Sequence, residues 1–202
     1  MSAPPTLDDP AAAAPLPLFP LRTVLFPGGL LPLRIFEPRY VDMIGRCMRE
    51  GGEFGVLWIV AGEETGAVVQ LAGTGCSARI VDFERLPDGL LGIMARGARR
   101  FDLLSHAAQA NGLNLGQVRW RPEPVHTPLS DARRPLGNVL RKVIDEYGEL
   151  GRHLQPDFSD AGWVANRFAE LLPLSRAERQ RLLEMDDPAA RLEAIAPMID
   201  VR

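Results

Sequence analysis

The segment from Leu16 to Tyr40, LPLFPLRTVLFPGGLLPLRIFEPRY, constrains the fold more than any other stretch of the chain. Its density of leucine, valine and phenylalanine is typical of strands that are buried on both faces. Prolines recur through the strands, and each lacks the N–H group that a sheet ladder needs, so each belongs at an edge or a bend. These prolines are Pro17, Pro20, Pro27 and Pro32. The segment therefore predicts a bent, closed sheet rather than a long flat one.

The tetrapeptide Phe26-Pro27-Gly28-Gly29 predicts a type II turn between two short strands. Proline presets φ at the second turn position, and glycine accepts a positive φ at the third. After the turn, Leu30 to Ile35 predicts a strand, and Glu37-Pro38 predicts the start of a helix because proline is tolerated in a first helical turn.

Strand signals then follow one another up to about Pro122. Between Leu71 and Leu86 apolar and charged residues alternate, with a small slip in register. The alternation predicts a strand whose one face carries Ala78, Ile80 and Phe83 and whose other face carries Arg79, Asp82 and Glu84. The turn signal Leu86-Pro87-Asp88-Gly89-Leu90 predicts a hairpin over residues 76–100, and Asn111-Gly112 predicts a second one. Because no long helix separates these strands, the pattern favours an antiparallel barrel or sandwich.

Beyond a proline-rich connector, apolar residues recur at helical spacing from Leu136 to Leu150 and again from Trp163 to Leu172. Ser175 and Glu178 have the spacing of a capping box, and Asp187 before Pro188 predicts an N-cap. We therefore predict an α+β protein with an N-terminal antiparallel, β-barrel-like domain at residues 16–124 and a C-terminal helical bundle at residues 129–202. Residues 1–15 are expected to form a disordered arm.

The run PLFPLRTVLFPGGLLPLRIFEPRYVDMI resembles the opening of the N-terminal substrate-binding domain of Lon proteases. That family also includes free-standing proteins without the ATPase and protease parts. The resemblance continues, more loosely, through Phe54 to Leu57, Ala72-Gly73-Thr74, the Gly97 to Phe101 strand and the helical tail. It implies a PUA-like N-terminal domain that binds exposed apolar segments of unfolded or extended polypeptide. It also implies a separate protease or chaperone as a candidate partner.

The lysine content opposes the activities of a full-length Lon protease. A standard P-loop needs lysine followed by serine or threonine, whereas Lys142, the sole lysine, precedes Val143. A serine–lysine dyad would also have to use Lys142, which lies inside a predicted helix with no serine nucleophile motif nearby. We therefore predict no catalytic residue and a non-enzymatic protein, even though the resemblance would attach the label of an ATP-dependent protease.

Cofactor, metal and membrane signals are weak. Gly73 to Ala78 fits the loose dinucleotide pattern GxGxxA, but a strand follows it where the pattern needs a helix, so we expect a bend or bulge. His106, His126 and His153 share no metal-ligand spacing, and Cys47 and Cys76 form no CxxC pair. We predict no cofactor, no metal and a cytoplasmic location, because no apolar stretch is long enough to span a membrane.

The first candidate site is apolar. Leu25, Phe26 and Pro27 lie at the predicted turn, and Phe36 lies at the next strand-to-helix junction. Large apolar side chains are hard to bury at a turn, and with a free strand edge nearby they would form a groove for extended polypeptide. In the alternative interpretation, Phe26 and Phe36 plug one end of the sheet.

The second candidate site is basic. It groups five arginines around Trp120, a combination used by surfaces that bind single-stranded nucleic acid. An RNA, a small ligand or an acidic peptide would fit such a patch. The alternative is a solvated face with Trp120 turned inward, and the net charge of −3 means that we do not expect a nucleic-acid partner. The five residues are Arg96, Arg99, Arg100, Arg119 and Arg121.

Overall fold

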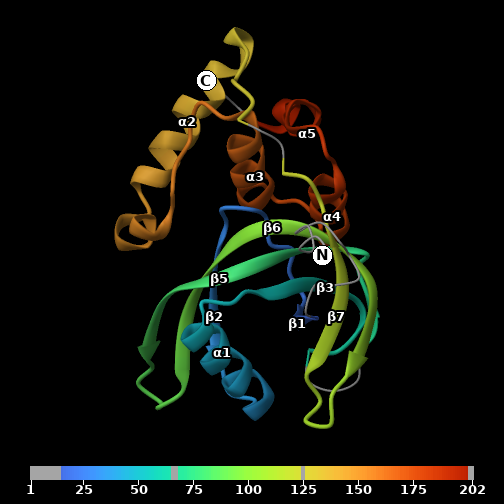
Figure 1. The fold of residues 1–202 in the computed structure, drawn as a ribbon. Helices are drawn as coiled ribbons and strands as arrows, with labels where there is room; N and C mark the ends of the chain where they lie inside the picture. The colour runs from blue at the N-terminus through green and yellow to red at the C-terminus, as the bar shows by residue number, and fades with distance from the viewer. Residues whose placement is uncertain (1–14, 65–67, 124–125, 200–202) are drawn as a thin grey trace, which may run out of the picture.

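The computed structural model describes residues 15–64, 68–123 and 126–199. Within these residues a mostly antiparallel sheet comes first, and five α-helices accompany it, four of them after the last strand. We call these two parts the β lobe and the helical lobe (Figure 1). The predicted disordered arm lies almost entirely outside the described residues.

In the described part of the chain, the β lobe contains seven strands and one α-helix. The strands are β1 (Leu16–Leu21), β2 (Leu30–Ile35), β3 (Phe54–Gly62), β4 (Val68–Leu71), β5 (Thr74–Arg85), β6 (Leu91–Ala108) and β7 (Asn114–Trp120). Helix α1 (Pro38–Glu50) follows β2 and lies on the opposite side of the sheet from the other helices (Figure 1). Its face of Tyr40, Met43, Ile44 and Cys47 is buried.

The strand pairings form a circuit. β1 pairs with β7, β7 with β6, β6 with β5 and β5 with β3, and β3 pairs again with β1. The β1–β3 pair is parallel, which the sequence did not predict, and the long crossover through β2 and α1 makes it possible. β2 pairs with β6 alone among the described strands.

The predicted pair of hairpins is in fact built on one shared strand. β6 runs unbroken over 18 residues, pairing with β2 and β5 in its first part and with β7 in its second. At Gly75 on β5, the second glycine of the GxGxxA pattern, an added Cβ would lie 2.6 Å from the Val56 carbonyl oxygen. The pattern therefore marks a close approach of two strands next to a bulge between Cys76 and Ala78.

The helical lobe contains α2 (Arg134–Asp145), α3 (Ala161–Leu171), α4 (Arg176–Glu184) and α5 (Pro188–Ile195), with a 3-10 segment, η2 (Gly148–His153), between α2 and α3. The predicted caps are confirmed: Ser175 and Glu178 form a capping box, and the Asp187 side chain accepts from the Ala189 N–H. Helix α3 is the central one, since its residues from Ala161 to Ala169 are all buried.

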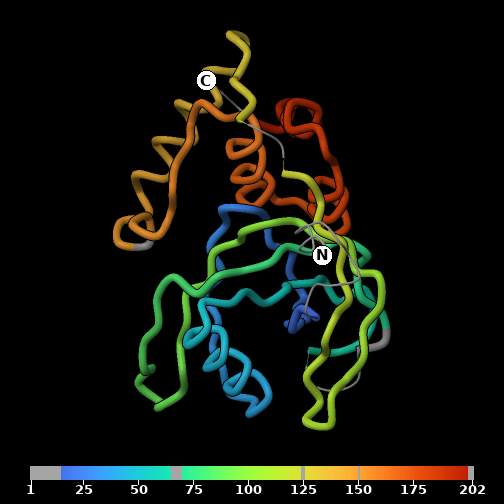
Figure 2. Tube along the Cα trace, viewed as in Figure 1, coloured from blue at the N-terminus to red at the C-terminus, as the bar shows by residue number. Residues whose placement is uncertain are grey.

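The segment between β1 and β2 joins the two lobes. It rises from the sheet to the base of α3, where it lies in blue beneath the orange helix (Figure 2). Its Val24 and Phe26 belong to the same buried cluster as Trp163 and Phe168 of α3. The helical lobe therefore takes part of its core from the β lobe.

Candidate functional site

The predicted turn is present but does not form an exposed groove. The Gly29 N–H donates to the Phe26 carbonyl at 3.0 Å, and Gly28 has φ +76°, as the type II turn requires. Phe26 is 0 % exposed and Leu25 is 4 % exposed. The expectation that these two side chains form an exposed groove is therefore wrong: α3 covers Phe26, and Leu25 packs in the β-lobe core, where it reaches only the wall of a small cavity.

The other two turn-region candidates are accessible to different degrees. Pro27 is partly buried, and its carbonyl accepts hydrogen bonds from Asn166 Nδ2 at 3.3 Å and Arg167 Nη2 at 3.0 Å. Phe36 is 58 % exposed at the β2–α1 junction. Phe36 is thus the one member of the apolar set with a largely free side chain.

Gly97 of β6 fixes the turn against the sheet. The Gly28 N–H donates to the Gly97 carbonyl and the Gly97 N–H donates to the Gly29 carbonyl, both at 2.8 Å. A Cβ at position 97 would lie 2.1 Å from the Phe26 carbonyl oxygen, so only glycine allows this approach. The turn is therefore rigidly held as part of the joint between the lobes.

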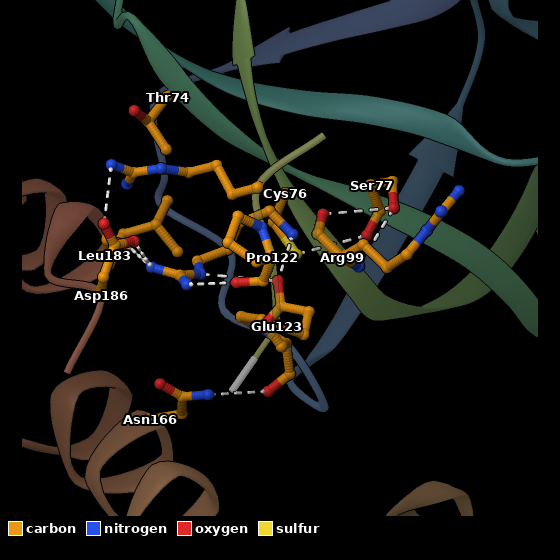
Figure 3. Close-up of polar contacts among 12 residues, drawn as sticks. Thr74, Cys76, Ser77, Arg99, Pro122, Glu123, Asn166, Leu183 and Asp186 are labelled. Atoms are coloured by element: carbon orange, nitrogen blue, oxygen red, sulfur yellow. Dashed lines mark hydrogen bonds and ion pairs between the residues drawn. The ribbon is translucent and has the colours of Figure 1, made fainter. Parts of the chain in front are cut away.

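The predicted basic patch is not a continuous free surface, because Arg100 is 1 % exposed. Its Nη1 donates to the carbonyls of Leu183 at 3.1 Å and Met185 at 2.9 Å, and it lies 3.2 Å from Asp186 Oδ1. Figure 3 shows Leu183 and Asp186 of the helical lobe facing Pro122 and Glu123 of the connector across these contacts. Arg100 therefore holds the two lobes together.

The other four arginines also have partners. Arg119 and Arg121 both reach Asp102, at 2.9 and 3.4 Å, as expected for residues on one strand face. Burial alone would raise the pKa of Asp102, but hydrogen bonds from Arg119 and Thr74 and the charge of Arg121 hold it below its usual value. Arg99 stacks over the Trp120 ring at 3.9 Å, and Arg96 donates to the His153 carbonyl.

A groove of about 600 Å³ lies between the β lobe and η2, and we call it the Phe83 groove. It crosses the three neighbouring strands β2, β6 and β5, and η2 forms its far wall. Asp82 on β5 meets η2 through Arg152 at 3.2 Å and His153 at 3.3 Å. The apolar lining of the Phe83 groove includes Pro32, Leu33, Phe83, Leu86, Ile93 and Met94.

Phe83 is the most exposed large apolar side chain in the described residues, at 59 %. A second hollow of about 390 Å³, which includes Met48 and Ile80, lies between the end of α1 and β5 and also uses Phe83. Phe83 lies on the predicted face of β5, since it pairs with the buried Ile93, yet its own side chain is exposed. A bulge between Ile80 and Asp82 accounts for the slip in register that the sequence indicated, and Phe83 is exposed because α1 ends before it covers this part of β5.

Beside Phe83, β5 has a free edge. Among the described residues, β3 pairs with β5 only from Cys76 to Ala78, so Arg79 to Arg85 have no strand partner on that side. An edge of this kind presents backbone N–H and C=O groups to an incoming strand. The sequence carried no local signal for this site, since it arises where β3 and α1 both end.

A smaller cavity of about 260 Å³ lies where β2 faces α2 and α3, and we call it the Arg167 cavity. Pro32 lines both this cavity and the Phe83 groove, so the two hollows adjoin along β2. Burial raises the pKa of Glu170 in its wall to about 7, against the opposing charges of Arg167 and Arg179. The walls further include Leu25, Leu30, Leu31, Tyr147 and Leu171.

The described residues show neither a metal site nor a membrane-spanning helix, and their cysteines are buried. Within 15–64, 68–123 and 126–199, no three His, Cys, Asp or Glu side chains gather in a way that would hold a metal ion. No helix in this part of the chain is both long and apolar enough to cross a membrane. Cys47 and Cys76 are buried free thiols, and burial raises the pKa of both.

Comparison with known proteins identifies relatives along nearly the whole chain. The family described as the ATP-dependent protease La (LON) substrate-binding domain matches residues 15–201. The crystal structure of a Lon N-terminal domain protein from Xanthomonas campestris is 37 % identical, with a TM-score of 0.76, covering 93 % of this chain and all of that one. The N-terminal domain of a Mycobacterium avium complex Lon protease has the same fold, with 19 % identity, a TM-score of 0.62, and coverage of 91 % of this chain and 97 % of that one.

Full-length Lon proteases match over the same region only. The Lon protease of Xanthomonas oryzae pv. oryzae is 27 % identical over 200 residues, which is 92 % of this chain and 23 % of that protein. The chain therefore spans about a quarter of the length of the curated relatives that it matches. The family match from end to end, together with the 37 % identity to a solved Lon N-terminal domain protein, shows that this chain belongs to the Lon substrate-binding domain family.

Proposed function

We propose that this chain is a non-enzymatic module that binds extended, partly apolar polypeptide in the Phe83 groove. The observation that carries the proposal is the placement of Phe83, which is 59 % exposed, between two hollows and next to a free strand edge. A large aromatic side chain in that position would be buried by a partner at the centre of a contact, where binding energy is concentrated.

The strand edge suggests how the polypeptide would be held. Main-chain groups of Arg79 to Arg85, apart from the Phe83 N–H that donates to Asp82 Oδ1 at 2.9 Å, would pair with an added strand. Such pairing gives affinity without demanding a particular sequence. Alternate side chains of that strand would then enter the apolar hollows on the two sides of Phe83. This mode suits unfolded or extended segments, because a folded protein rarely offers a free strand.

The charges around the groove favour a polypeptide over a nucleic acid. Two arginines, Arg34 and Arg152, face three acidic side chains, Asp82, Glu84 and Glu149, so the lining carries no excess positive charge. Nucleic-acid surfaces need a basic excess, since phosphate neutralisation supplies most of their affinity. The ion pairs of Arg100, Arg119 and Arg121 count against the arginine patch for the same reason.

The sequence supports a role without intrinsic enzyme activity. Lys142, the sole lysine, lies in α2 with its side chain exposed, outside any P-loop sequence. Because the relatives are Lon proteases, a separate protease or chaperone is the partner class that we propose to act on the bound polypeptide. The purified chain should hydrolyse no ATP and cleave no casein; activity that a point mutation in this chain abolishes would overturn this part of the proposal.

Replacement of Phe83 tests the groove. The Phe83→Ser variant should bind a reduced and alkylated, permanently unfolded protein at least about tenfold more weakly than the wild type, a loss of roughly 1.4 kcal/mol or more. Its free energy of unfolding should change by less than about 1 kcal/mol, as for other surface substitutions. Binding would be measured by fluorescence anisotropy with the labelled unfolded protein.

Leu104→Ser is the matched control, because Leu104 is 54 % exposed on β6 and lines neither hollow beside Phe83. It should leave binding unchanged. Phe36→Ser tests the remaining residue of the apolar turn region in the same assay, and a loss confined to that variant would move the site to the β2–α1 junction. Full binding by a stably folded Phe83→Ser variant would overturn the proposed groove.

A further inference from the structure

The main-chain groups of Ile80 and Phe83 point away from β6, toward the free edge of β5. Gly97 of β6 uses both its N–H and its carbonyl on the turn before β2, so it faces the β2 side of its strand. Because backbone direction alternates along a strand, Ala95 and Ile93 face that side as well. These are the β6 partners of Ile80 and Phe83, whose own N–H and carbonyl groups therefore lie on the free edge.

The bulge in β5 brings these two residues into phase. In a regular strand, residues three apart point to opposite faces of the sheet. Here an extra residue lies between Ile80 and Asp82, so Ile80 and Phe83 pair with Ala95 and Ile93, which are two apart on β6. Ile80 and Phe83 therefore share one face of the sheet as well as one edge.

An edge with two equivalent positions can pair with a copy of itself. In an antiparallel pair about a two-fold axis, Ile80 of each copy lies opposite Phe83 of the other. The Phe83 N–H already donates to Asp82 Oδ1 at 2.9 Å, so the main-chain bond at each position would run from the Ile80 N–H to the Phe83 carbonyl. The end of the β5–β6 hairpin extends away from the helical lobe, which leaves room for a second copy (Figure 1).

The charges along the edge are complementary in that register. Arg79 would lie opposite Glu84 of the second copy, and the two-fold axis would repeat the pair. Arg79 is 63 % exposed and uses its Nε on Glu53 at 2.7 Å, while Glu84 is exposed and has no ion-pair partner among the described residues. Opposite charges directly across two strands stabilise the pairing, and like charges destabilise it.

The same register provides an apolar site for the exposed ring of Phe83. The hollow of about 390 Å³ at the end of α1 is lined by Cys47, Met48 and Ile80. The Phe83 side chain of a second copy, placed opposite Ile80, would enter this hollow, and the exchange would be reciprocal. Two rings that are each 59 % exposed in the single chain would thus be covered together.

We propose that the free edge of β5 pairs with the same edge of a second copy of this chain, in the register that aligns Ile80 with Phe83. This self-association goes beyond the proposed function, and only its consequence rests on that function. The dimer covers Phe83 and the main-chain groups that would hold an extended polypeptide. A second copy and a polypeptide therefore compete, and the fraction of chains open to polypeptide falls as the concentration of the chain rises.

Charge reversal tests the proposed register. Without polypeptide, sedimentation equilibrium of the wild type should show monomers and dimers in a concentration-dependent balance. Arg79→Glu and Glu84→Arg each oppose two like-charged pairs and should raise the dimer dissociation constant at least about tenfold, which corresponds to roughly 1.4 kcal/mol. An equimolar mixture of the two variants should regain the wild-type affinity, because every pair in the mixed dimer again has opposite signs.

Arg119→Glu is the matched control. Arg119 is 65 % exposed and forms an ion pair with Asp102, as Arg79 does with Glu53, but it lies on β7. This variant should dimerise like the wild type. A wild type that stays monomeric at every concentration would overturn the self-association and leave the proposed function in place. Unchanged affinity in folded Arg79→Glu and Glu84→Arg would overturn the assignment to β5, and a mixture that fails to recover would overturn the register.

Competition tests the consequence. Addition of the reduced and alkylated, permanently unfolded protein should convert wild-type dimers to monomers that carry it. A dimer that persists with the unfolded protein bound would overturn the shared use of the edge. An unfolded protein that binds neither monomer nor dimer would overturn the proposed function and leave the self-association in place.

Discussion

Phe26 and Phe83 both belong to the β lobe, and each lies where a regular strand pattern is interrupted, yet the first is 0 % exposed and the second 59 %. The difference lies in what surrounds them. Phe26 sits on a turn that rises into the helical lobe, where Trp163 and Phe168 belong to the same buried cluster. Phe83 follows a bulge on β5, beyond the point where β3 stops pairing with that strand.

Local sequence therefore sets the conformation of a turn or strand but not its exposure. The Phe26 turn has the hydrogen bond and the positive glycine φ that its residues demand. Its burial depends on helices that follow more than a hundred residues later. The exposure of Phe83 depends in the same way on neighbours, here on their absence along the free edge of β5 among the described residues.

Separating the lobes is the most drastic test of this comparison. Residues 129–202 alone should show no cooperative thermal unfolding, because Val24 and Phe26 of their core cluster lie on the other fragment. Residues 15–124 should still unfold cooperatively, since the other two buried clusters consist of residues before Arg121. Circular dichroism of both fragments is the measurement.

A cooperative transition in the isolated 129–202 fragment would show that the helical lobe is stable without the turn. The boundary between residues 16–124 and 129–202, which we predict from the proline-rich connector, would then also separate two independently folding domains. Mixing the fragments provides the control, because restored cooperativity would point to the shared cluster rather than to damage at the new chain ends.

The paired substitutions Phe26→Ala and Phe83→Ala measure the same contrast within the whole chain. Phe26→Ala should lower the free energy of unfolding by about 3–5 kcal/mol, since it removes a fully buried aromatic ring and leaves a cavity between the lobes. Phe83→Ala should change it by less than about 1 kcal/mol. Denaturant unfolding of both variants measures these changes. Similar losses of unfolding free energy in the two variants would contradict the assignment of Phe26 to the core and Phe83 to the surface.

Much of the fold was predictable because it depends on local signals. The capping box of Ser175 and Glu178, the N-cap Asp187 and the turn at Gly28 act within a few residues, and each is present as expected. The family resemblance, carried by the opening segment, is confirmed by the match over residues 15–201. These signals require no knowledge of distant contacts.

The candidate site was not predictable in the same way. Two of the apolar candidates, Leu25 and Phe26, are buried by segments remote in sequence, and Arg100 crosses to carbonyls that lie more than eighty residues later. Alternation with a slip in register placed Phe83 on the correct face of β5, but it could not show that α1 ends before it covers that side chain. Contacts between segments remote in sequence therefore decide which of these side chains are buried.

A smaller effect on stability is expected from Glu170, which lies on α3, the helix that covers Phe26. Its pKa is raised from 4.5 to about 7 by burial, so the folded state binds its proton more tightly than the unfolded state does. Its contribution to stability is therefore fully present below about pH 4.5 and is lost as the pH rises through about 7. Glu170→Gln cannot ionise and should lack this loss.

The measured quantity is the difference in unfolding free energy between the wild type and Glu170→Gln. From pH 5 to pH 8 the wild type should lose about 1–2 kcal/mol of unfolding free energy relative to the variant. This is less than the roughly 3 kcal/mol of the full pKa shift, because 26 % of the Glu170 side chain is exposed. Other groups titrate in both proteins and cancel. A difference that is independent of pH, or one that moves in favour of the wild type, would contradict the raised pKa.

The smallest change in unfolding free energy is expected at the rim of the Phe83 groove, where the arginines are more exposed than Arg100 between the lobes. Arg34 forms an ion pair with Asp88, but 61 % of its side chain is exposed, so water screens the attraction and two mobile side chains must be ordered to form it. Arg34→Gln should therefore change the free energy of unfolding by less than about 1 kcal/mol. Arg100→Gln, which removes a guanidinium that is 1 % exposed and hydrogen-bonded to Leu183 and Met185, should cost more in the same denaturant titration. Equal costs would mean that the joint between the lobes is no more tightly held than the open groove, and the contrast between Phe26 and Phe83 would then rest on apolar contacts alone.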